Sequence, residues 1–279
     1  GAIVDQLSGN DANLISDRIE LSAAQGIGSA DALEINANTI WVENSGASGD
    51  IELVQVAGGG KLVIEGLAQS DPNGSGAINL DSQAGDIEVV AAGAGVVIAG
   101  SGALTLSASA GASNIIVDVA LTTGAGALGL TATQAIVQNS TIRSDSGAVT
   151  LTAQSGAITM AAAAETQAAA ITYTAGTDIA LSSLQSASTV DVVATSGAIT
   201  LTGVGAGTVS GGAATFAAGT HIGTSAAPLQ TTVDRIVATA DAGGIYIEEL
   251  NSVRLIDISA AGTGSAAQIL SRSGTITAK

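Results

Sequence analysis

Residues 70–76, with the sequence SDPNGSG, place oxygen-bearing side chains at alternate positions ahead of a glycine. This spacing is typical of the start of a calcium-binding loop, in which Asp71, Asn73 and Ser75 would supply hard oxygen ligands. A complete loop of this class carries a bidentate glutamate at its twelfth position, where this chain has Ser82. An ordinary Asp-Pro-Asn-Gly turn explains the same residues. The sequence therefore predicts at most a weak calcium site, and calcium is the one cofactor that it suggests.

Two residue combinations could support catalysis. The single histidine, His221, could form a Ser-His-Asp triad with Ser225 and Asp234, but the surrounding sequence contains no nucleophile elbow. A lone histidine in a segment rich in glycine and threonine is typical of a solvated loop. A pair of carboxylates that cleaves polysaccharide is the stronger enzyme hypothesis, because many parallel β-helices act on polysaccharides.

The distribution of charge argues against that enzyme hypothesis. More than half of the 24 acidic residues lie before residue 89, where only Arg18 and Lys61 oppose them. The arginines that could position a sugar stand apart from these acids, at Arg143, Arg235, Arg254 and Arg272. Because no acid and base converge, we expect no enzymatic activity. The net charge of −17 also argues against nucleic acid and anionic membranes as partners.

The composition limits the kind of core that the chain can build. Hydrophobic residues make up 46% of the 279 residues but aromatic residues only 1%, so the core must consist of small aliphatic side chains in thin layers. The 37 glycines predict many tight corners, at which glycine can adopt a positive φ. The uncharged stretch 89–117 is long enough for a membrane helix, but its glycines and serines break it into short runs, so we expect no membrane span.

The elements themselves are visible as a repeated phrase. Residues 147–160, GAVTLTAQSGAITM, contain two copies of a glycine followed by alternating apolar residues and threonine. This alternation predicts short strands with one buried face. We expect Val149, Leu151, Ile158 and Met160 to point inward and the threonines between them to point outward.

The intervals between copies predict the architecture. Two series of apolar positions recur at about 21 residues, namely Leu128, Val149, Ile171 and Val190, and Ile136, Ile158, Ile179 and Ile199. We therefore predict an all-β fold, a parallel β-helix (β-solenoid) of about thirteen coils of about 21 residues. It forms one continuous domain over 1–279, acid-rich and less regular in 1–120 and more regular in 121–279. A β-sandwich or antiparallel barrel is the alternative, and it would need hairpins and more aromatic residues.

Two sets of outward residues follow from this fold. Threonine pairs recur at Thr131/Thr133, Thr150/Thr152, Thr172/Thr174 and Thr200/Thr202, and the first three pairs fall on successive coils, where they would form a regular outward array. Such an array is similar to the ice-binding faces of some β-solenoids, although threonine is also an ordinary outward strand residue. We expect Glu20, Glu34, Glu52 and Glu88 to project outward near like charges on neighbouring coils, where divalent cations would relieve their repulsion.

Tandem Gly-x-Ile-x-Leu-x-Ala phrases, rich in Ala, Gly, Thr and Ser and free of cysteine, resemble the repeat region of filamentous-haemagglutinin-type adhesins and related giant bacterial surface proteins. The resemblance implies a right-handed parallel β-helix, secretion to the cell surface and a structural or adhesive task without catalysis. The chain departs from those families in its irregular spacing before residue 120 and in lacking a recognisable secretion or capping domain.

These observations together predict a non-enzymatic structural or adhesive segment of a large extracellular or cell-surface bacterial fibre. The alternatives are a polysaccharide-active β-helix and a carbohydrate- or ice-binding one. Residues 1–4 and 273–279 both match interior strand phrases. We therefore expect head-to-tail self-association or continuation of a longer chain, together with a cell-surface or glycan receptor.

Overall fold

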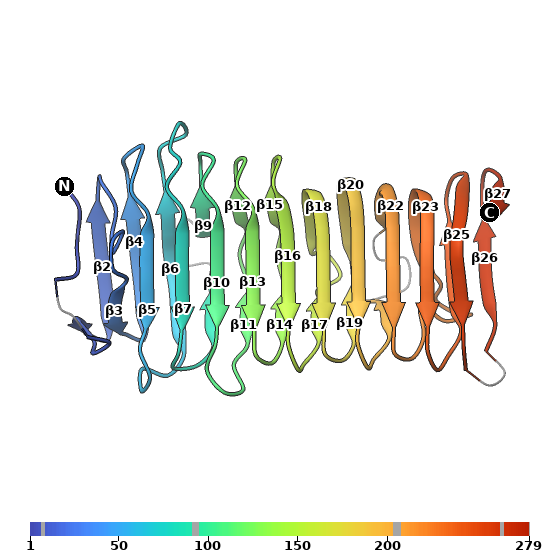
Figure 1. Cartoon of the computed structure of the whole chain (residues 1–279), viewed down its shortest axis with the longest axis horizontal. Helices are drawn as coiled ribbons and strands as arrows, with labels where there is room; N and C mark the ends of the chain where they lie inside the picture. The colour runs from blue at the N-terminus through green and yellow to red at the C-terminus, as the bar shows by residue number, and fades with distance from the viewer. Residues whose placement is uncertain (7–8, 91–94, 203–207, 263–264, 279) are drawn as a thin grey trace.

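The computed structural model describes the chain except for residues 7–8, 91–94, 203–207, 263–264 and 279. The chain forms a β-solenoid of about 12 turns of about 22 residues, and the coils stand side by side from the N-terminus to the C-terminus (Figure 1). At a strand spacing of about 4.8 Å, the stack is roughly 55 Å long. The described residues contain no helix, and hence none long and apolar enough to cross a membrane.

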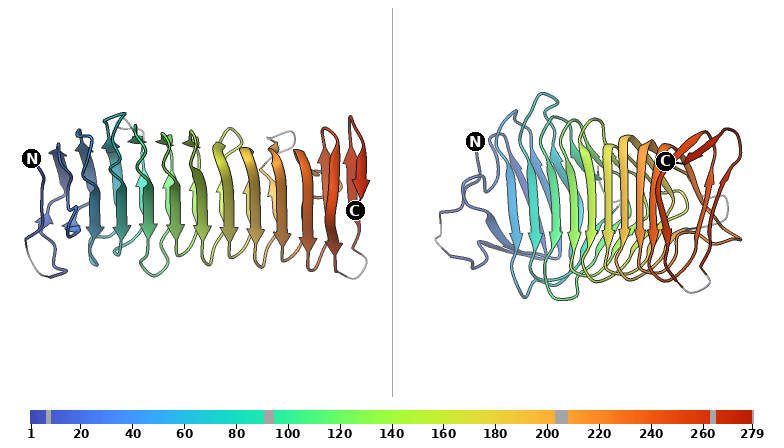
Figure 2. Two further views of the ribbon diagram at one scale, coloured as in Figure 1. Left: turned by 45° about the horizontal axis from the view of Figure 1, so that its top comes forward. Right: turned by 45° about the vertical axis from the view of Figure 1, so that its right-hand side comes forward.

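The described strands form one continuous parallel sheet that winds around a single core (Figure 2), and its pairings fall into three faces, here called sheets I, II and III. Sheet I contains β9 (Gly95–Ile98), β12 (Leu121–Thr123) and β15 (Ile142–Ser144). Sheet II contains β1 (Leu14–Ile15), β3 (Leu33–Asn36), β5 (Ile51–Gln55), β7 (Ile78–Ser82), β10 (Leu104–Ala108), β13 (Leu128–Ala132), β16 (Ala148–Ala153), β25 (Val253–Ala260) and β27 (Ile276–Ala278). Sheet III contains β8 (Ile87–Val89), β11 (Ile115–Val117), β14 (Ile136–Gln138), β17 (Ile158–Met160), β19 (Ile179–Leu181) and β21 (Ile199–Leu201).

Longer strands pass from one sheet into the next. Those that begin in sheet III and end in sheet I are β2 (Arg18–Ala23), β4 (Thr39–Asn44), β6 (Leu62–Gln69), β24 (Ile245–Glu249) and β26 (Ala267–Ser271). Those that begin in sheet I and end in sheet II are β18 (Glu165–Ala175), β20 (Ser183–Ala194), β22 (Val209–Ala218) and β23 (Leu229–Ala240). Every described strand pairing is parallel, which excludes the sandwich and antiparallel barrel.

The register confirms the two predicted series of apolar positions. Leu128 pairs with Val149, Val149 with Ile171 and Ile171 with Val190, while Ile136, Ile158, Ile179 and Ile199 pair in the same way in sheet III. The inward residues of residues 147–160, Val149, Leu151, Ile158 and Met160, are fully buried. The core is therefore a set of continuous aliphatic columns, in which each coil rests on the equivalent side chains of the coil before it.

The early coils are longer than the sequence repeat predicts. The paired positions Ile51, Ile78, Leu104 and Leu128 advance by 24 to 27 residues, whereas Leu128, Val149, Ile171 and Val190 advance by 19 to 22. The additional residues lie at the corners between sheets, and the strands remain short. This accounts for about 12 turns where division by the shorter repeat predicts about thirteen.

The glycines that open the strands of sheet II have a different role from the one predicted. A Cβ on Gly126 would lie 1.7 Å from the carbonyl oxygen of Gly102, and a Cβ on Gly102 would lie 1.8 Å from that of Gly76. None of these three glycines has a positive φ. They are needed because the backbones of successive coils approach too closely for any side chain at this corner.

Buried polar residues occupy some of the inward corner positions. The Tyr173 hydroxyl lies 2.7 Å from Gln138 Oε1 and 2.6 Å from Thr166 Oγ1, and all three residues are buried. The Gln138 amide also donates to the backbone oxygens of Ser140 and Glu165, at 3.0 and 3.1 Å. The network joins the end of β14 to β18 and satisfies the polar atoms that the solenoid takes out of water.

Candidate functional site

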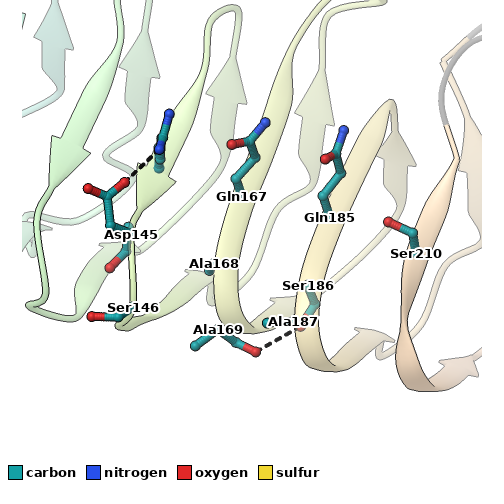
Figure 3. A pocket seen from close by; sticks show the side chains of 11 residues that line it. Asp145, Ser146, Gln167, Ala168, Ala169, Gln185, Ser186, Ala187 and Ser210 are labelled. Carbon is teal, nitrogen blue, oxygen red and sulfur yellow. Dashed lines mark hydrogen bonds and ion pairs between the residues drawn. The ribbon is translucent and has the colours of Figure 1, made fainter.

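A groove runs over sheet I, and its largest hollow has a volume of about 500 Å³ over β15, β18, β20 and β22 (Figure 3). Parallel register places Arg143 beside Gln167, Gln167 beside Gln185 and Gln185 beside Ser210, one residue from each successive coil. All four occupy outward positions, so the solenoid converts four distant residues into one polar row. The Gln167 and Gln185 side chains project in the same direction from the ribbon.

The polar groups in this hollow differ in how far they are already engaged. The Arg143 Nε donates to Asp145 Oδ1 at 2.7 Å, which neutralises both charges. The Gln185 amide donates to Glu165. No described residue hydrogen-bonds the side-chain amide of Gln167, so its carbonyl and amino group both remain available to a ligand.

Two smaller hollows extend the groove toward the N-terminus. The first, of about 330 Å³, lies over β9 and β12 and shares Arg143 and Asp145 with the largest hollow. The second, of about 280 Å³, lies over β4, β6 and β9 and shares Val97 and Ala99 with the first. The sheet I groove thus crosses eight successive coils, which corresponds to about 34 Å at the usual strand spacing.

An aromatic ring lies at the N-terminal end of the groove. Trp41, the only tryptophan, is half-buried and lines the hollow of about 280 Å³. A Cβ on Gly66 of the next coil would lie 2.5 Å from Trp41 Cδ1 and 2.6 Å from Nε1, so the indole packs directly on the Gly66 backbone. The absence of a side chain at residue 66 therefore holds the ring against the sheet, with its remaining surface toward the hollow.

The carboxylates of the groove do not form the pair that glycoside cleavage uses. Asp145 is the only carboxylate that lines the two hollows beside Arg143, and Glu43 is the only one that lines the hollow beside Trp41. Hydrolysis requires two carboxyl groups that flank one bond at about 5 to 10 Å. The described lining of the groove instead consists of hydrogen-bonding side chains around Gln167 and an aromatic ring at Trp41.

The threonines form a second candidate surface on sheet II. Thr150 pairs with Thr172, and Thr152 pairs with both Thr131 and Thr174, so two complete threonine doublets lie on adjacent coils with a fifth threonine beside them. Gly129 interrupts one column, and Asp191 and Val193 end the array on the next coil. Thr133 and Thr202 do not belong to it: their hydroxyls hydrogen-bond backbone carbonyl oxygens at the corners, at 2.7 and 2.7 Å.

The predicted calcium segment forms a turn. The Asp71 carboxylate accepts a hydrogen bond from the Asn73 backbone at 2.8 Å, and the Asp71 carbonyl accepts one from Gly74 at 3.0 Å. This is the geometry of an Asp-Pro-Asn-Gly turn. The Ser75 backbone is bonded to Ala47 of the preceding coil. Within the described ranges, no group of three or more His, Cys, Asp or Glu side chains could hold a metal ion.

The structure does not assemble the conceivable triad. Among the residues that the structure describes, the only hydrogen-bond partner of the His221 ring is the neighbouring Thr220 hydroxyl, at 3.4 Å, and no hydrogen bond joins His221 to Ser225 or Asp234. Ser225 and Asp234 are both exposed. These residues therefore lack the contacts by which a base would activate a serine.

Glu20, Glu52 and Glu88 are not buried, whereas Glu34 lies between the inward residues Leu33 and Ile35 on the outward side of its strand but is covered and only 6% exposed. Asn13 of the first coil accepts from the Glu34 backbone at 2.7 Å and covers this strand. Burial raises the pKa of Glu34, and the nearby Asp5 and Asp31 carboxylates raise it further. The register also places no like charge directly beside the other three, because their partners include Trp41, Asn79 and Ile116.

Sequence reasoning missed a buried acid in the last coils. Glu249 is fully buried and accepts hydrogen bonds from the Thr231 hydroxyl at 2.7 Å and from the Val233 and Asn251 backbones at 3.2 Å. Burial raises its pKa, although these hydrogen bonds oppose the shift. Its position was visible in the sequence, because Glu249 continues the alternation of the inward residues Ile245 and Ile247.

No family model matches the chain, and neither a curated protein nor a solved structure matches it. The resemblance to surface adhesins therefore rests on the repeated phrases and on the parallel β-solenoid that they form. That fold is compatible with a structural or adhesive role. A more specific function must be argued from the geometry of the coils themselves.

Proposed function

We propose that this chain is a non-enzymatic structural or adhesive segment of a large bacterial fibre at the cell surface or in the extracellular space. The observation that carries the proposal is the state of the two terminal coils. Each presents a row of strands paired on one side only, together with large exposed apolar side chains. Such a surface is complementary to another coil of the same kind.

Among the described residues, the large apolar side chains that are exposed lie in the first and last coils. Val4 is 51% exposed and Ile15 77% exposed in the first coil, and Leu270 is 55% exposed and Ile276 40% exposed in the last. Ile276 continues an inward column beside Val253, whereas Val4, Ile15 and Leu270 lie on the outward side of their strands, next to the inward residues Ile3, Leu14 and Ile269. β1 and β2 pair only with β3 and β4, and β26 and β27 pair only with β24 and β25.

A further coil on either end would complete the burial of the inward residues Ile3, Leu14, Ile269 and Ile276 and pair the free strands. That coil is supplied by continuation of the polypeptide or by a second copy stacked head to tail. The second contact joins different surfaces and does not close, so it extends into a fibre. The lack of a paired-carboxylate site in the described groove supports the non-enzymatic half of the proposal.

Light scattering and electron microscopy of the 279-residue chain test the stacking. We expect rods that lengthen with concentration. Ile15→Lys combined with Leu270→Lys should keep the rods short, because it places charge on the singly paired strands of both terminal coils, whereas Thr122→Lys on a strand paired on both sides should not. A monomer over a wide concentration range, with both terminal coils protected from hydrogen exchange, would contradict the proposal.

The threonine array on sheet II supports a second candidate function, ice binding. Thr150, Thr152, Thr172 and Thr174 form a grid with spacings of about 4.8 Å between coils and about 6.7 Å along a strand. A regular grid of hydroxyl and methyl groups suits an ordered water surface. Thermal hysteresis that is abolished by Thr152→Lys but retained in Thr122→Lys would establish this function, and freezing-point behaviour equal to that of an inert protein would exclude it.

A further inference from the structure

We infer that the sheet I groove binds an extended neutral polysaccharide chain that lies along the axis of the solenoid. This inference rests on the adhesive part of the proposed function, because it names the class of receptor. It does not depend on the stacking of the terminal coils.

The dimensions of the groove indicate a polymer. Its three hollows join end to end from Trp41 in β4 to Ser210 in β22, through shared residues at each junction. The groove is open along its length and about 34 Å long at the usual strand spacing. Small-molecule sites are enclosed clefts that bury most of the ligand, whereas a long open channel with a repeating floor matches a ligand that itself repeats.

The side chains indicate hydroxyl groups as the main hydrogen-bonding partners. Gln167 offers an unengaged donor and acceptor, and Ser210 in the same row offers a hydroxyl oxygen as acceptor, since its proton is donated to the Leu184 carbonyl oxygen at 3.3 Å. The Arg143–Asp145 pair presents further donors and acceptors without net charge. Groups that both donate and accept match sugar hydroxyls, which do the same. At the other end, the half-buried Trp41 provides an apolar ring surface on which the carbon-bound hydrogens of a sugar ring can rest.

Charge decides against an anionic polymer. The lining of the groove has one arginine, which Asp145 already pairs, and the chain carries a net charge of −17. A sulfated or uronic-acid polymer would therefore be repelled and would find no free cation. A neutral polysaccharide is therefore the class of polymer that fits the groove.

The backbone decides against a peptide. Peptides that bind β-sheet proteins usually add a strand to a free edge. Each strand of the groove, from β4 to β22, is paired on both sides. Only side chains are available to a ligand here, as expected for a glycan-binding surface.

Affinity electrophoresis in gels that contain a soluble neutral polysaccharide tests the inference. A β-1,4-linked glucan, an α-linked dextran and a neutral mannan serve as probes, and polygalacturonate serves as the anionic comparison. We expect retardation by at least one neutral polymer and none by polygalacturonate. Retardation by polygalacturonate alone, or by no polymer, overturns the inference.

Variants then locate the binding surface. Gln167→Ala combined with Gln185→Ala removes two amides from the exposed row and should weaken binding about fivefold or more. Trp41→Ala should weaken it to a similar degree. Thr150→Ala combined with Thr172→Ala changes the opposite candidate surface and should leave binding unchanged, and circular dichroism checks that each variant folds.

The outcomes distinguish this inference from the proposed function. All measurements are repeated with Ile15→Lys and Leu270→Lys present. If binding persists in this background, the groove acts independently of stacking. If the groove variants bind as well as the unmodified chain, or if the threonine variants lose binding instead, the groove is not the site, whatever the result of the stacking experiment.

Discussion

The close approach of backbones at the glycine corner of sheet II predicts a large effect from a single methyl group. In Gly126→Ala the new Cβ would lie 1.7 Å from the carbonyl oxygen of Gly102. Contacts under 3.0 Å essentially never occur at a real Cβ, so the two coils must separate by more than 1 Å at this point. The Leu104 amide, which donates to Ala127 at 2.9 Å, is next to the contact and would lose its partner.

Two costs combine in this variant. Overpacking in a filled interior costs about 1 to 3 kcal/mol, and a stretched hydrogen bond between buried backbone groups costs about 1 kcal/mol more. We therefore expect Gly126→Ala to lower the free energy of unfolding by about 3 kcal/mol. The effect should be local at first, because each coil contacts only its neighbours.

Gly129→Ala is the matched control. Gly129 lies three residues further along the same coil and faces outward, and the nearest heavy atom to its added Cβ is 3.9 Å away. Its φ is not positive. Alanine should fit there and stabilise the chain by about 0.5 to 1 kcal/mol, because it restricts the unfolded chain. The two variants therefore make the same chemical change and should shift stability in opposite directions.

Urea unfolding followed by circular dichroism, with hydrogen exchange to locate the change, measures both variants. In Gly126→Ala the amides of β10 and β13 should lose protection before those of distant coils. The reasoning is refuted if Gly126→Ala unfolds at the same urea concentration as the unmodified chain. It is also refuted if Gly129→Ala is destabilised equally, because the glycines would then matter for backbone freedom and not for space.

Two further predictions concern buried polar groups. Burial raises the pKa of Glu249, so the folded state holds its proton more tightly than the unfolded state does. The resulting stability is complete below the unfolded pKa of about 4.3 and is lost as pH rises through the folded pKa. Glu249→Gln should therefore flatten the fall in melting temperature above pH 4. Arg272 lowers the pKa of the adjacent Glu248. Glu248→Gln should instead remove stability that is present above the unfolded pKa and lost as pH falls. Melting curves from pH 3 to 8 in which both variants change the pH dependence of the melting temperature with the same sign would contradict the assignment. Tyr173→Phe should cost about 1 to 3 kcal/mol in urea unfolding, because it takes a hydrogen-bond partner from buried Gln138 and Thr166, whereas Tyr246→Phe, whose hydroxyl bonds no described residue, should change stability by less than about 0.5 kcal/mol.

The sequence was sufficient to predict the core because the core repeats itself. A nearly constant interval predicts the pairing of Leu128, Val149 and Ile171, and the alternation of apolar and polar residues predicts which side chains are buried. The count of coils was less accurate because the corners between Ile51 and Leu128 contain extra residues that do not alternate. Corners tolerate such insertions at small entropic cost, so they carry no periodic signal.

The candidate site was less predictable, because it depends on which residues of successive coils lie next to each other. From the sequence alone, Gln167 and Gln185 are ordinary outward strand residues, and only the strand register shows that they lie in one row. The burial of Glu34 could not be inferred from its own strand, since residues of the first coil cover it. The reason for the glycines at the corner of sheet II could not be predicted from the sequence either. Only the stacked backbones show that a Cβ at these positions would collide with the preceding coil.

The stacking of coils also determines how the chain responds to tension. Each coil of about 22 residues adds only about 4.8 Å to the stack, yet the same residues span about 75 Å when fully extended. Because a coil bonds only to its two neighbours, a pull on the two ends peels the terminal coil and leaves the next one intact. A chain of many such coils would yield one coil at a time, and each released coil would add about 70 Å to its length before the next coil carried the load.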